Sequence, residues 1–547
     1  MYTFAVPLDR ALATAAGSCA VVCQDNRRTY AELGSRCRRL AGALRRLGLA
    51  PGDRVGVISL NSDRYLELYL GVPAAGFVLV PVNSRLAPAE MRAILADAGV
   101  SVLFADADYP GAADVKRVLT MPGDYEDLIA AAGEADAADA ADDASGASGA
   151  RPAENDLAAL FYTSGTTGAA KGAMHTHRSL VSSALHFMAT WSFDPQTRWM
   201  VASPMFHTGG TIGTLATVWA GGAHIIMPRF DPDLAIDLIE REAVTHTLLV
   251  PTMLAAAANA QLARPRDVSS LRYLSHGASP ISAETLRKAQ RAFPGAELLH
   301  VYGTTEATPI TTLLPHEELV IDTPRVRSCG QPATGVEVRV VDSAGAEVKP
   351  GTVGEILVRS PSLMAGYWQK PEATAEVMRG DWYLTGDLGY RDDEGTFYFA
   401  GRGDDWLRVD GENFAAAPVE TILGRHPDVV ACVVFAVPDP RTGDLVMAAL
   451  ELKPGTAFDH KGFAGFLESQ SDLGTKWAPT YVRVVRALPV TATGKLNRVA
   501  LRADRWQTGD PVWWRPGRAL EYRLLTAGDR RDIQAVFENS GRGHLLA

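Results

Sequence analysis

Short apolar runs in this sequence end repeatedly in loops rich in glycine, serine and threonine. LAALFYT leads into SGTTGAAKG, and WMVASP leads into MFHTGG. Farther along, LRYLSH leads into GASP, and ELLHVY leads into GTTE. Apolar runs bounded by turn residues indicate buried strands. Because loops at the ends of neighbouring strands meet at one crevice of an open α/β sheet, the pattern predicts a layered α/β fold with a ligand site at the strand ends.

Helical and extended patterns also alternate outside these units. Apolar residues recur at helical spacing between Thr29 and Gly48, which predicts a helix there. VGVISL at 55–60 and VLVPV at 78–82 read as buried strands. VEVRVVD at 336–342 alternates with a period of two and indicates an added β-rich section. Together these segments favour layered α/β subdomains.

The chain is too long for one core, because single cores stop growing at about 250–300 residues and this chain has 547. The composition changes near GRGDD, so we expect a large N-terminal domain over 1–400. A small, mobile C-terminal α+β domain would follow over 401–505, with an extension over 506–547. The segment 132–150 is rich in alanine and aspartate and has no large apolar residue, so we interpret it as a surface loop.

Charge and cysteine content exclude several classes of protein. The net charge is −10 with no long basic run, which argues against nucleic acid as the main partner. The five cysteines are scattered and form no C-x-x-C motif, so neither disulfides nor a zinc site are expected. No signal peptide and no apolar run of about 20 residues is recognised. We therefore expect a cytoplasmic protein without a transmembrane segment.

The loop after LAALFYT has the composition of a phosphate site. Its glycines allow several N–H groups to point into one concavity, which suits an anion. Ser164, Thr166 and Thr167 add hydroxyl donors, and Lys171 adds a positive charge. The loop differs from the common G-x-x-x-x-G-K-[ST] pattern, because Gly172 follows the lysine. A plain surface turn is the alternative interpretation.

Taken whole, YTSGTTGAAKG resembles the phosphate loop of the adenylate-forming superfamily, which includes acyl-CoA synthetases, peptide-synthetase adenylation domains and firefly luciferase. Further segments resemble that superfamily's motifs in the same order, over about residues 10–505. They are SPMFHTGG for the acyl pocket, HGASPIS and YGTTE for adenine and metal, YLTGDLG for ribose, GRGDDWLRVDGENFAAAPVE for the hinge and the loop after it, and PVTATGKLNR for a lysine near the end. The ordered set makes the resemblance specific.

The resemblance implies a reaction in two halves with ATP, Mg²⁺ and coenzyme A. A carboxylate attacks the α-phosphate of ATP and forms acyl-AMP and pyrophosphate. A thiol then attacks the acyl carbon, and AMP leaves. In the first half an anion approaches a polyanion, so metal, lysine and N–H donors must offset the repulsion.

The resemblance also implies catalytic roles for particular residues. Lys495 would bridge the carboxylate and the α-phosphate, as a flexible point charge can. Lys171 would offset phosphate charge, and Thr305 would contact the α-phosphate. Glu306 would bind Mg²⁺ together with the hydroxyl of Thr163, because Mg²⁺ prefers oxygen ligands. A solvated glutamate and an ordinary surface lysine are the alternatives for Glu306 and Lys495.

Nucleotide binding is implied for a larger set. Tyr302 would offer an aromatic face to adenine, Asp387 would accept hydrogen bonds from the ribose hydroxyls, and Arg402 would contact ribose or phosphate. A core tyrosine and a turn-capping aspartate are the alternatives. The full ATP-binding set is Thr163, Ser164, Gly165, Thr166, Thr167, Gly168, Ala278, Tyr302, Gly303, Thr304, Asp387 and Arg402.

The acyl and thiol sites are implied in the same way. His207 and Gly277 would line the acyl pocket, with a packed core histidine as the alternative for His207. Asp404 matches the hinge about which the small domain would rotate between the two halves. That rotation would withdraw Lys495 and bring Gly411 against the pantetheine arm, where a glycine leaves room for a narrow tunnel.

The whole set predicts an ATP-dependent acyl-CoA synthetase for a fatty or other apolar carboxylic acid. The nearest alternative loads the acyl group onto a carrier protein instead of CoA. A luciferase-like oxidation and a non-catalytic nucleotide-binding homologue are more distant. The acyl chain length and the oligomeric state stay open, although a homodimer is the commonest closed assembly.

Overall fold

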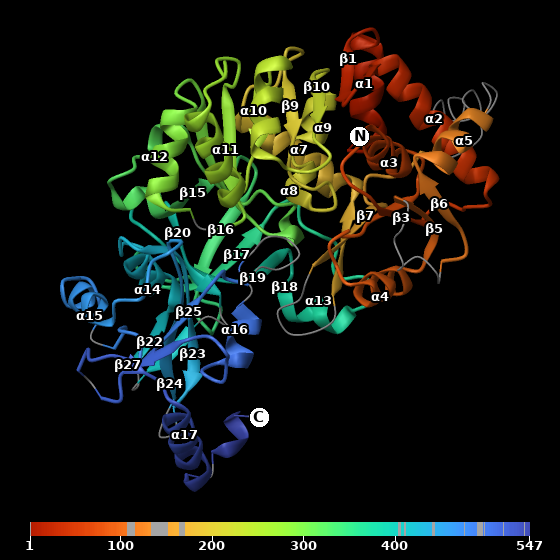
Figure 1. Ribbon diagram of the computed structural model, residues 1–547. Helices are drawn as coiled ribbons and strands as arrows, with labels where there is room; N and C mark the ends of the chain where they lie inside the picture. The colour runs from red at the N-terminus through yellow and green to blue at the C-terminus, as the bar shows by residue number, and fades with distance from the viewer. Residues whose placement is uncertain are drawn as a thin grey trace. The chain divides into compact units, whose positions relative to one another are not determined.

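The structure is a computed structural model with a mixed α/β fold, a large N-terminal domain and a smaller C-terminal domain (Figure 1), which confirms the expected fold class. The described chain divides into two compact units, and the domain limits expected near 400 and 505 stay predictions. Unit 1 comprises Met1–Arg339, Leu357–Thr385 and Arg391–Tyr398, and unit 2 comprises Val340–Ile356, Gly386–Tyr390 and Phe399–Ala547. The structure describes residues 2–106, 115–132, 151–163, 170–279, 281–402, 406–409, 412–439, 443–474, 476–489, 496, 498–517, 519–540 and 542–546.

Unit 1 contains a six-stranded sheet in the order β6-β5-β3-β4-β7-β8. Its strands pair in parallel except at the β7–β8 edge, where the pairing is antiparallel. The two expected strands near 55 and 78 are confirmed as β3 and β4. The strands are β3 (Arg54–Ile58), β4 (Val78–Pro81), β5 (Val100–Asp106), β6 (Val118–Met121), β7 (Leu157–Thr163) and β8 (Lys171–Thr176).

A second run of strands in unit 1 has the order β2-β1-β10-β9-β11-β12-β13-β14-β15. From β1 to β13 neighbouring strands are parallel, and β2, β14 and β15 join antiparallel. The carboxyl ends of β12 and β13 therefore lie side by side. The strands are β1 (Cys19–Cys23), β2 (Asn26–Thr29), β9 (Arg198–Val201), β10 (Ala223–Ile226), β11 (His246–Leu248), β12 (Tyr273–Gly277), β13 (Glu297–Tyr302), β14 (Thr312–Leu314) and β15 (Ser328–Pro332).

Helices cover these sheets because they bury an apolar stripe. The helix expected after Thr29 is α2, and a capping box between Thr29 and Glu32 satisfies its first N–H groups. Helices α10, α11 and α12 pack with alternate residues of β9, β10, β12 and β13 in one core. The helices of unit 1 are α1 (Ala5–Ala15), α2 (Tyr30–Arg46), α3 (Asp63–Ala74), α4 (Pro88–Ala98), α5 (Gly123–Ala131), α7 (His177–Thr190), α8 (Thr208–Thr211), α9 (Thr214–Ala220), α10 (Pro232–Arg241), α11 (Pro251–Ala263), α12 (Ala283–Ala292) and α13 (Pro371–Val377).

The expected β-rich section follows β15 in the chain. Its strands are β16 (Glu337–Val341), β17 (Gly354–Arg359), β18 (Met378–Arg379), β19 (Trp382–Arg391) and β20 (Phe397–Arg402). Strand β16 matches the period-two alternation seen in the sequence, as a strand with unlike faces should. The section carries YLTGDLG, because that motif lies within β19.

Unit 2 is built on the sheet β23-β24-β25-β26-β27. Alternate residues of β23 and β24 contribute to two separate cores, so each face of this sheet is covered. Trp506 is 1% exposed in one of them, and residues after it supply β26 and β27. The elements are the hairpin β21 (Trp406–Val409) and β22 (Glu412–Ala415), the sheet strands β23 (Val429–Pro438), β24 (Asp444–Leu452), β25 (Tyr481–Val485), β26 (Val512–Trp514) and β27 (Arg523–Leu524), and the helices α14 (Ala416–Leu423), α15 (His460–Glu468), α16 (Arg498–Asp504) and α17 (Ala527–Asn539).

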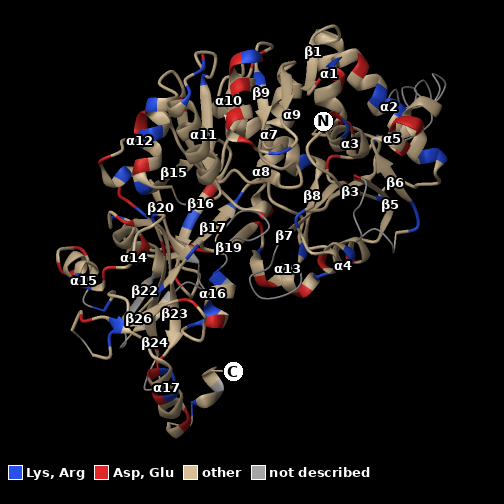
Figure 2. Ribbon diagram, in the orientation of Figure 1, with Lys and Arg blue, Asp and Glu red and all other residues tan. Residues whose placement is uncertain are grey.

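The surface carries charges of both signs. Figure 2 shows acidic and basic residues interspersed on the helices α10 and α12 of unit 1. No disulfide joins the five cysteines, all of which lie in the described chain. Within the described residues, no helix combines the length and the apolar character that crossing a bilayer requires.

Candidate active site

Strands β7 and β8 flank the predicted phosphate loop. Thr163 is the last residue of β7 and Lys171 is the first of β8, and the two pair across the antiparallel ladder. The Thr163 hydroxyl donates to the Lys171 carbonyl oxygen at 3.4 Å. The predicted loop residues 164–168 lie outside the described residues. The residues on either side of the loop, Thr163 and Lys171, are held next to each other by the pairing of β7 with β8.

The YGTTE motif follows β13 and forms a tight turn. Tyr302 ends β13, and Thr305 and Glu306 belong to the short helix η1 (Thr305–Ala307). The Thr304 hydroxyl is buried without a hydrogen-bond partner among the described residues. A buried donor without a partner costs free energy, so this hydroxyl is suited to a bound ligand.

Backbone strain marks the loops on either side of this turn. Ala278 follows β12 with φ 68°, and Thr308 follows η1 with φ 57°. Positive φ is unusual for residues other than glycine, and strained residues of this kind are enriched at functional sites. Ala278 is itself a predicted nucleotide-binding residue, and Thr308 lies two residues after Glu306, so the strain coincides with the predicted site.

Hydroxyl groups hold Thr308 in that conformation. The Ser183 hydroxyl donates to the Thr308 carbonyl oxygen, and the Thr308 hydroxyl donates to the Ser362 carbonyl oxygen at 2.8 Å. Ser362 in turn donates to the Ala307 carbonyl oxygen at 3.3 Å. The turn after Glu306 is thus fixed by three side chains.

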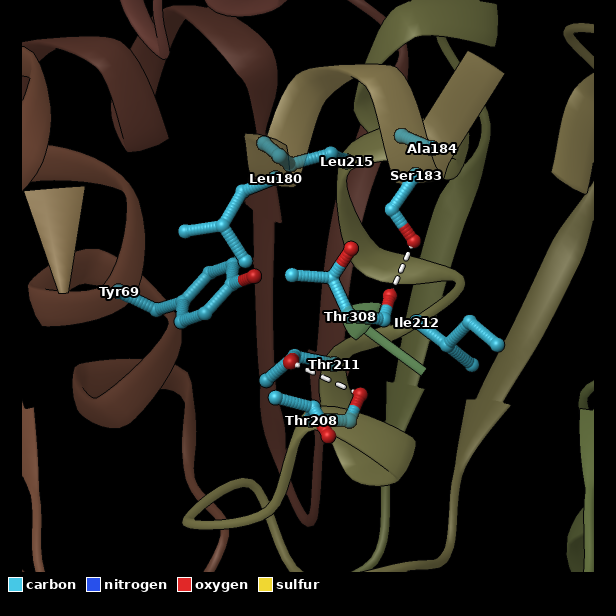
Figure 3. Close-up of a pocket in the computed structure, with 9 residues that line it drawn as sticks. All are labelled: Tyr69, Leu180, Ser183, Ala184, Thr208, Thr211, Ile212, Leu215 and Thr308. Atoms are coloured by element: carbon cyan, nitrogen blue, oxygen red, sulfur yellow. Dashed lines mark hydrogen bonds between the residues drawn. The ribbon is translucent and has the colours of Figure 1, made fainter. Parts of the chain in front are cut away.

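Ser183 and Thr308 also line a small cavity, together with the Tyr69 ring and the Leu180 side chain (Figure 3). Thr211 and Thr208 line it as well, and the Thr211 hydroxyl donates a hydrogen bond to the Thr208 carbonyl oxygen. The cavity has room for about one water molecule. A nucleotide or an acyl chain needs hundreds of Å³, so this cavity belongs to the packing around the site.

Two glycines permit close backbone approach at the strand ends. A Cβ on Gly277 would lie 2.1 Å from the Val301 carbonyl oxygen. A Cβ on Gly303 would lie 1.8 Å from the Pro309 carbonyl oxygen. Both positions therefore exclude a side chain.

Glu306 and Lys171 are linked through one aromatic residue. The Tyr367 hydroxyl donates to Glu306 Oε1 at 2.9 Å. The Lys171 ammonium lies 5.2 Å from the centre of the Tyr367 ring, within range for a cation–π interaction. The structure thus brings together three predicted site residues, Thr163, Lys171 and Glu306. Tyr367 was not predicted, because nothing in the local sequence pattern indicates its contacts.

Strand β8 also carries a buried histidine. His175 on β8 is fully buried, and its ring meets Phe161 edge-to-face at 5.8 Å between centroids. Burial lowers the pKa of His175 to about 3, and the Thr305 backbone opposes that shift. The ring is therefore neutral near pH 7, and it packs as a core residue against Phe161.

The donors present fit Mg²⁺. Glu306 offers a carboxylate and Thr163 a hydroxyl, and both are hard oxygen donors. Among the described residues no group of three or more His, Cys, Asp or Glu side chains could enclose a metal ion. Mg²⁺ is usually bound through one or two carboxylates, phosphate oxygens and water, so a sparse oxygen set of this kind is sufficient.

The other predicted site residues are not among those that the structure brings together around Tyr367. His207 is half-buried directly before α8, and its ring contacts Phe206 at 4.6 Å between centroids. Asp387 is 3% exposed on β19 in unit 2. Arg402 ends β20, and the structure describes only its backbone. Asp404, Gly411 and Lys495 lie outside the described residues.

Two family models match the chain. The model of the AMP-binding enzymes matches residues 8–368, and that of the AMP-binding enzyme C-terminal domain matches residues 418–495. The chain therefore belongs to the AMP-binding enzyme family, within the adenylate-forming superfamily. It is an enzyme of the AMP-forming acid–thiol ligase class.

Individual relatives agree with this membership. A feruloyl-CoA synthase from Amycolatopsis sp is 36% identical over 87% of this chain and 93% of its own length. A steroid-22-oyl-CoA synthetase from Rhodococcus jostii is 35% identical over 93% of this chain and 92% of its own. The structure of ATP-bound MatB from Rhodopseudomonas palustris superimposes with a TM-score of 0.81 at 30% identity, covering 91% of this chain and 97% of that one.

Proposed function

We propose that this protein is an ATP-dependent acyl-CoA synthetase that converts an apolar carboxylic acid to acyl-AMP and then to acyl-CoA. The observation that carries the proposal is the contact chain from Lys171 through Tyr367 to Glu306. It joins a loop-flanking cation and a carboxylate from motifs far apart in the sequence. Attack on a nucleoside triphosphate requires its negative charge to be offset, and a cation together with a carboxylate that binds a metal ion can do this.

In the first half-reaction the phosphate loop would surround the β- and γ-phosphates. Lys171 would offset their charge, and Thr305 would orient the α-phosphate. Glu306 and Thr163 would hold Mg²⁺, which neutralises phosphate charge when bound. Lys495 would stabilise the charge that builds up as the carboxylate attacks.

The adenosine moiety would bind at the ends of β12 and β13. Tyr302 would pack against adenine, and backbone groups of Ala278, Gly303 and Thr304 would line its edge. The strained backbone at Ala278 and the unpartnered Thr304 hydroxyl support binding here. Asp387 would accept hydrogen bonds from the ribose hydroxyls.

In the second half-reaction a thiol would displace AMP. We propose that residues 401–505 rotate about Asp404, withdraw Lys495 and bring Gly411 to the pantetheine arm of CoA. Two half-reactions with different nucleophiles need different groups at one centre, and a domain rotation can supply them.

The acyl group is proposed to be uncharged. From Pro204 to Ala223, which includes His207, the chain has no Asp, Glu, Lys or Arg. An unpaired charge in such surroundings would be costly, which disfavours amino acids and dicarboxylates. Fatty acids are the class we expect first. Aryl and steroid-like acids follow, because relatives are named for ferulate and for a steroid acid.

A carrier protein is the second candidate for the thiol. A relative from Streptomyces coeruleorubidus, named fatty acid–[acyl-carrier-protein] ligase ScoC, is 33% identical over 89% of this chain. Both acceptors would present a phosphopantetheine thiol, so the same catalytic residues would serve either. The acceptor must be identified by its product.

The test is pyrophosphate release with ATP, Mg²⁺ and a panel of fatty, aryl and steroid acids, with and without CoA. We expect release that depends on the acid, with CoA converted to a thioester. Release that stops after about one turnover despite CoA would favour a carrier protein. ATP binding without release for every acid would contradict the proposal and favour a non-catalytic nucleotide-binding protein.

A further inference from the structure

The segment 362–368 connects the two charged parts of the proposed ATP site. At one end Met364 donates its N–H to the Glu306 carbonyl oxygen at 2.8 Å. At the other end Trp368 donates its N–H to the Gly172 carbonyl oxygen at 2.8 Å. The segment therefore ties the metal-binding turn to the strand that leaves the phosphate loop.

Tyr367 directly precedes Trp368 in this segment and contacts both charges. Its side chain is 6% exposed and packs in a small core with Ala173, Met364 and Tyr383. Its hydroxyl is the donor to Glu306 Oε1, and its ring faces the Lys171 ammonium. The ring has a packing role, whereas the hydroxyl has an electrostatic one.

We propose that Tyr367 is a positioning residue that orients the Glu306 carboxylate for the metal ion. The inference rests on the proposed function, because it takes Glu306 as a ligand of Mg²⁺. A glutamate side chain has several rotatable bonds, and fixing one before binding reduces the entropy lost when the metal is captured. The hydrogen bond engages Oε1 of Glu306 and leaves Oε2 free to bind the metal ion.

The ring has a separate effect on Lys171. An aromatic face attracts an ammonium group, so it favours lysine conformations near the Tyr367 ring and thus on the side of Glu306. Phenylalanine would keep this face and the packing but lose the hydroxyl. The substitution Tyr367→Phe therefore separates the orientation of the carboxylate from the placement of the lysine.

Tyr162 provides a matched control. Its hydroxyl donates to a carboxylate oxygen of Asp97 at 2.6 Å, and it lies on β7 in the same sheet as Lys171. Tyr162→Phe removes the same atom from the same kind of hydrogen bond. It leaves the Tyr367–Glu306 bond untouched.

The experiment measures ATP binding to the full-length protein by equilibrium titration over a series of Mg²⁺ concentrations. For Tyr367→Phe we expect the Mg²⁺ concentration that gives half of the metal-dependent gain in ATP affinity to rise by about tenfold, because a hydrogen bond to a charged group is lost. ATP affinity without metal, and at saturating Mg²⁺, should stay within about twofold of wild type, since the ring still faces Lys171. Tyr162→Phe should keep the wild-type Mg²⁺ requirement.

Glu306→Ala separates failure of this inference from failure of the proposed function. If the wild type shows no Mg²⁺ dependence, or if Glu306→Ala keeps it, the proposed metal site is wrong. If both behave as proposed while Tyr367→Phe needs no more Mg²⁺ than wild type, the positioning role alone is overturned. An equal shift in Tyr162→Phe would also overturn it, because the effect would then reflect general weakening of the sheet.

Discussion

The turn after β13 has room for no side chain at position 303, since a Cβ would lie 1.8 Å from the Pro309 carbonyl oxygen. We predict that Gly303→Ala displaces the turn and lowers stability by at least about 1–3 kcal/mol. ATP affinity should fall with it, because the displaced turn carries Thr304, Thr305 and Glu306. Denaturant unfolding and ATP titration measure the two effects.

Gly295 provides the control for this substitution. A Cβ there would meet nothing within 4 Å, so Gly295→Ala should leave stability and ATP affinity near wild type. A Gly303→Ala protein as stable as Gly295→Ala, with normal ATP binding, would show that the close approach does not constrain the turn.

The strained residue after Glu306 gives a second prediction at this scale. Ser183→Ala removes the hydroxyl that holds the Thr308 carbonyl, so we expect about 1 kcal/mol lower stability and weaker ATP binding. Ser179→Ala removes a comparable bond, from Ser179 to the Thr176 carbonyl oxygen at 3.0 Å, at the start of the same helix. It should lower stability without changing ATP affinity. Equal ATP affinities in the two variants would contradict the argument.

Between elements, a buried charge network joins α2, α3 and α5. Glu67 on α3 is 0% exposed, accepts from Arg36 Nε at 2.7 Å, and accepts from the Tyr125 hydroxyl at 2.7 Å. Burial raises the pKa of Glu67 despite these partners. Neutralising Glu67 removes the fully buried partner of Arg36, which then keeps, among the described residues, only the partly exposed Glu126 as an ion-pair partner.

We therefore predict that Glu67→Gln destabilises the protein by about 1.5–3 kcal/mol, because buried hydrogen bonds to a charged group are lost. Glu126 contacts Arg36 and Arg64 from a position that is 35% exposed, so Glu126→Gln should cost no more than about 1 kcal/mol. Denaturant unfolding of both variants measures the difference. Equal losses would mean that burial does not set the cost of this network.

Local patterns predicted individual elements well. The helix after Thr29, the strands near 55 and 78, and the strands that lead into motifs all depend on residues close together in the chain. Turn chemistry and apolar spacing are local properties, so the sequence carries them directly. The family motifs also predicted the functional loops that follow β7 and β13.

Contacts between distant segments could not be predicted in the same way. Tyr367 meets Glu306 and Lys171 because the segment 362–368 pairs with β8, and Glu67 meets Arg36 because two helices pack. Such pairings depend on topology, and the single sequence contains no periodic signal for them. The roles of Asp404, Gly411 and Lys495 rest on the resemblance alone, since they lie outside the described residues.

For the whole molecule, buried neutral histidines predict a pH dependence of stability. Burial lowers the pKa of His175 to about 3 and that of His177 and His246 to about 4, whereas an unfolded histidine titrates near 6.5. Between these values the unfolded chain binds more protons, so it gains stability relative to the fold as the pH falls. The stabilisation is fully present above about pH 6.5 and is lost progressively toward pH 4, by up to about 1.4 kcal/mol per histidine per pH unit.

Thermal unfolding midpoints across this range measure the effect. His177 accepts the Phe4 N–H through Nδ1, and asparagine can accept a hydrogen bond without taking up a proton. His177→Asn should therefore flatten the fall between pH 6.5 and 4. A variant profile parallel to that of the wild type would show that His177 does not contribute.

The central claim is that a carboxylate oxygen attacks the α-phosphate and leaves with AMP. With an accepted acid labelled with ¹⁸O in both carboxylate oxygens, attack forms a C–O–P bond and breaks the bond to pyrophosphate. Thiol attack on the acyl carbon then breaks the C–O bond, so mass spectrometry should find one ¹⁸O atom in each AMP released. AMP without label, or ADP and phosphate as products, would contradict an acyl-adenylate intermediate in this enzyme.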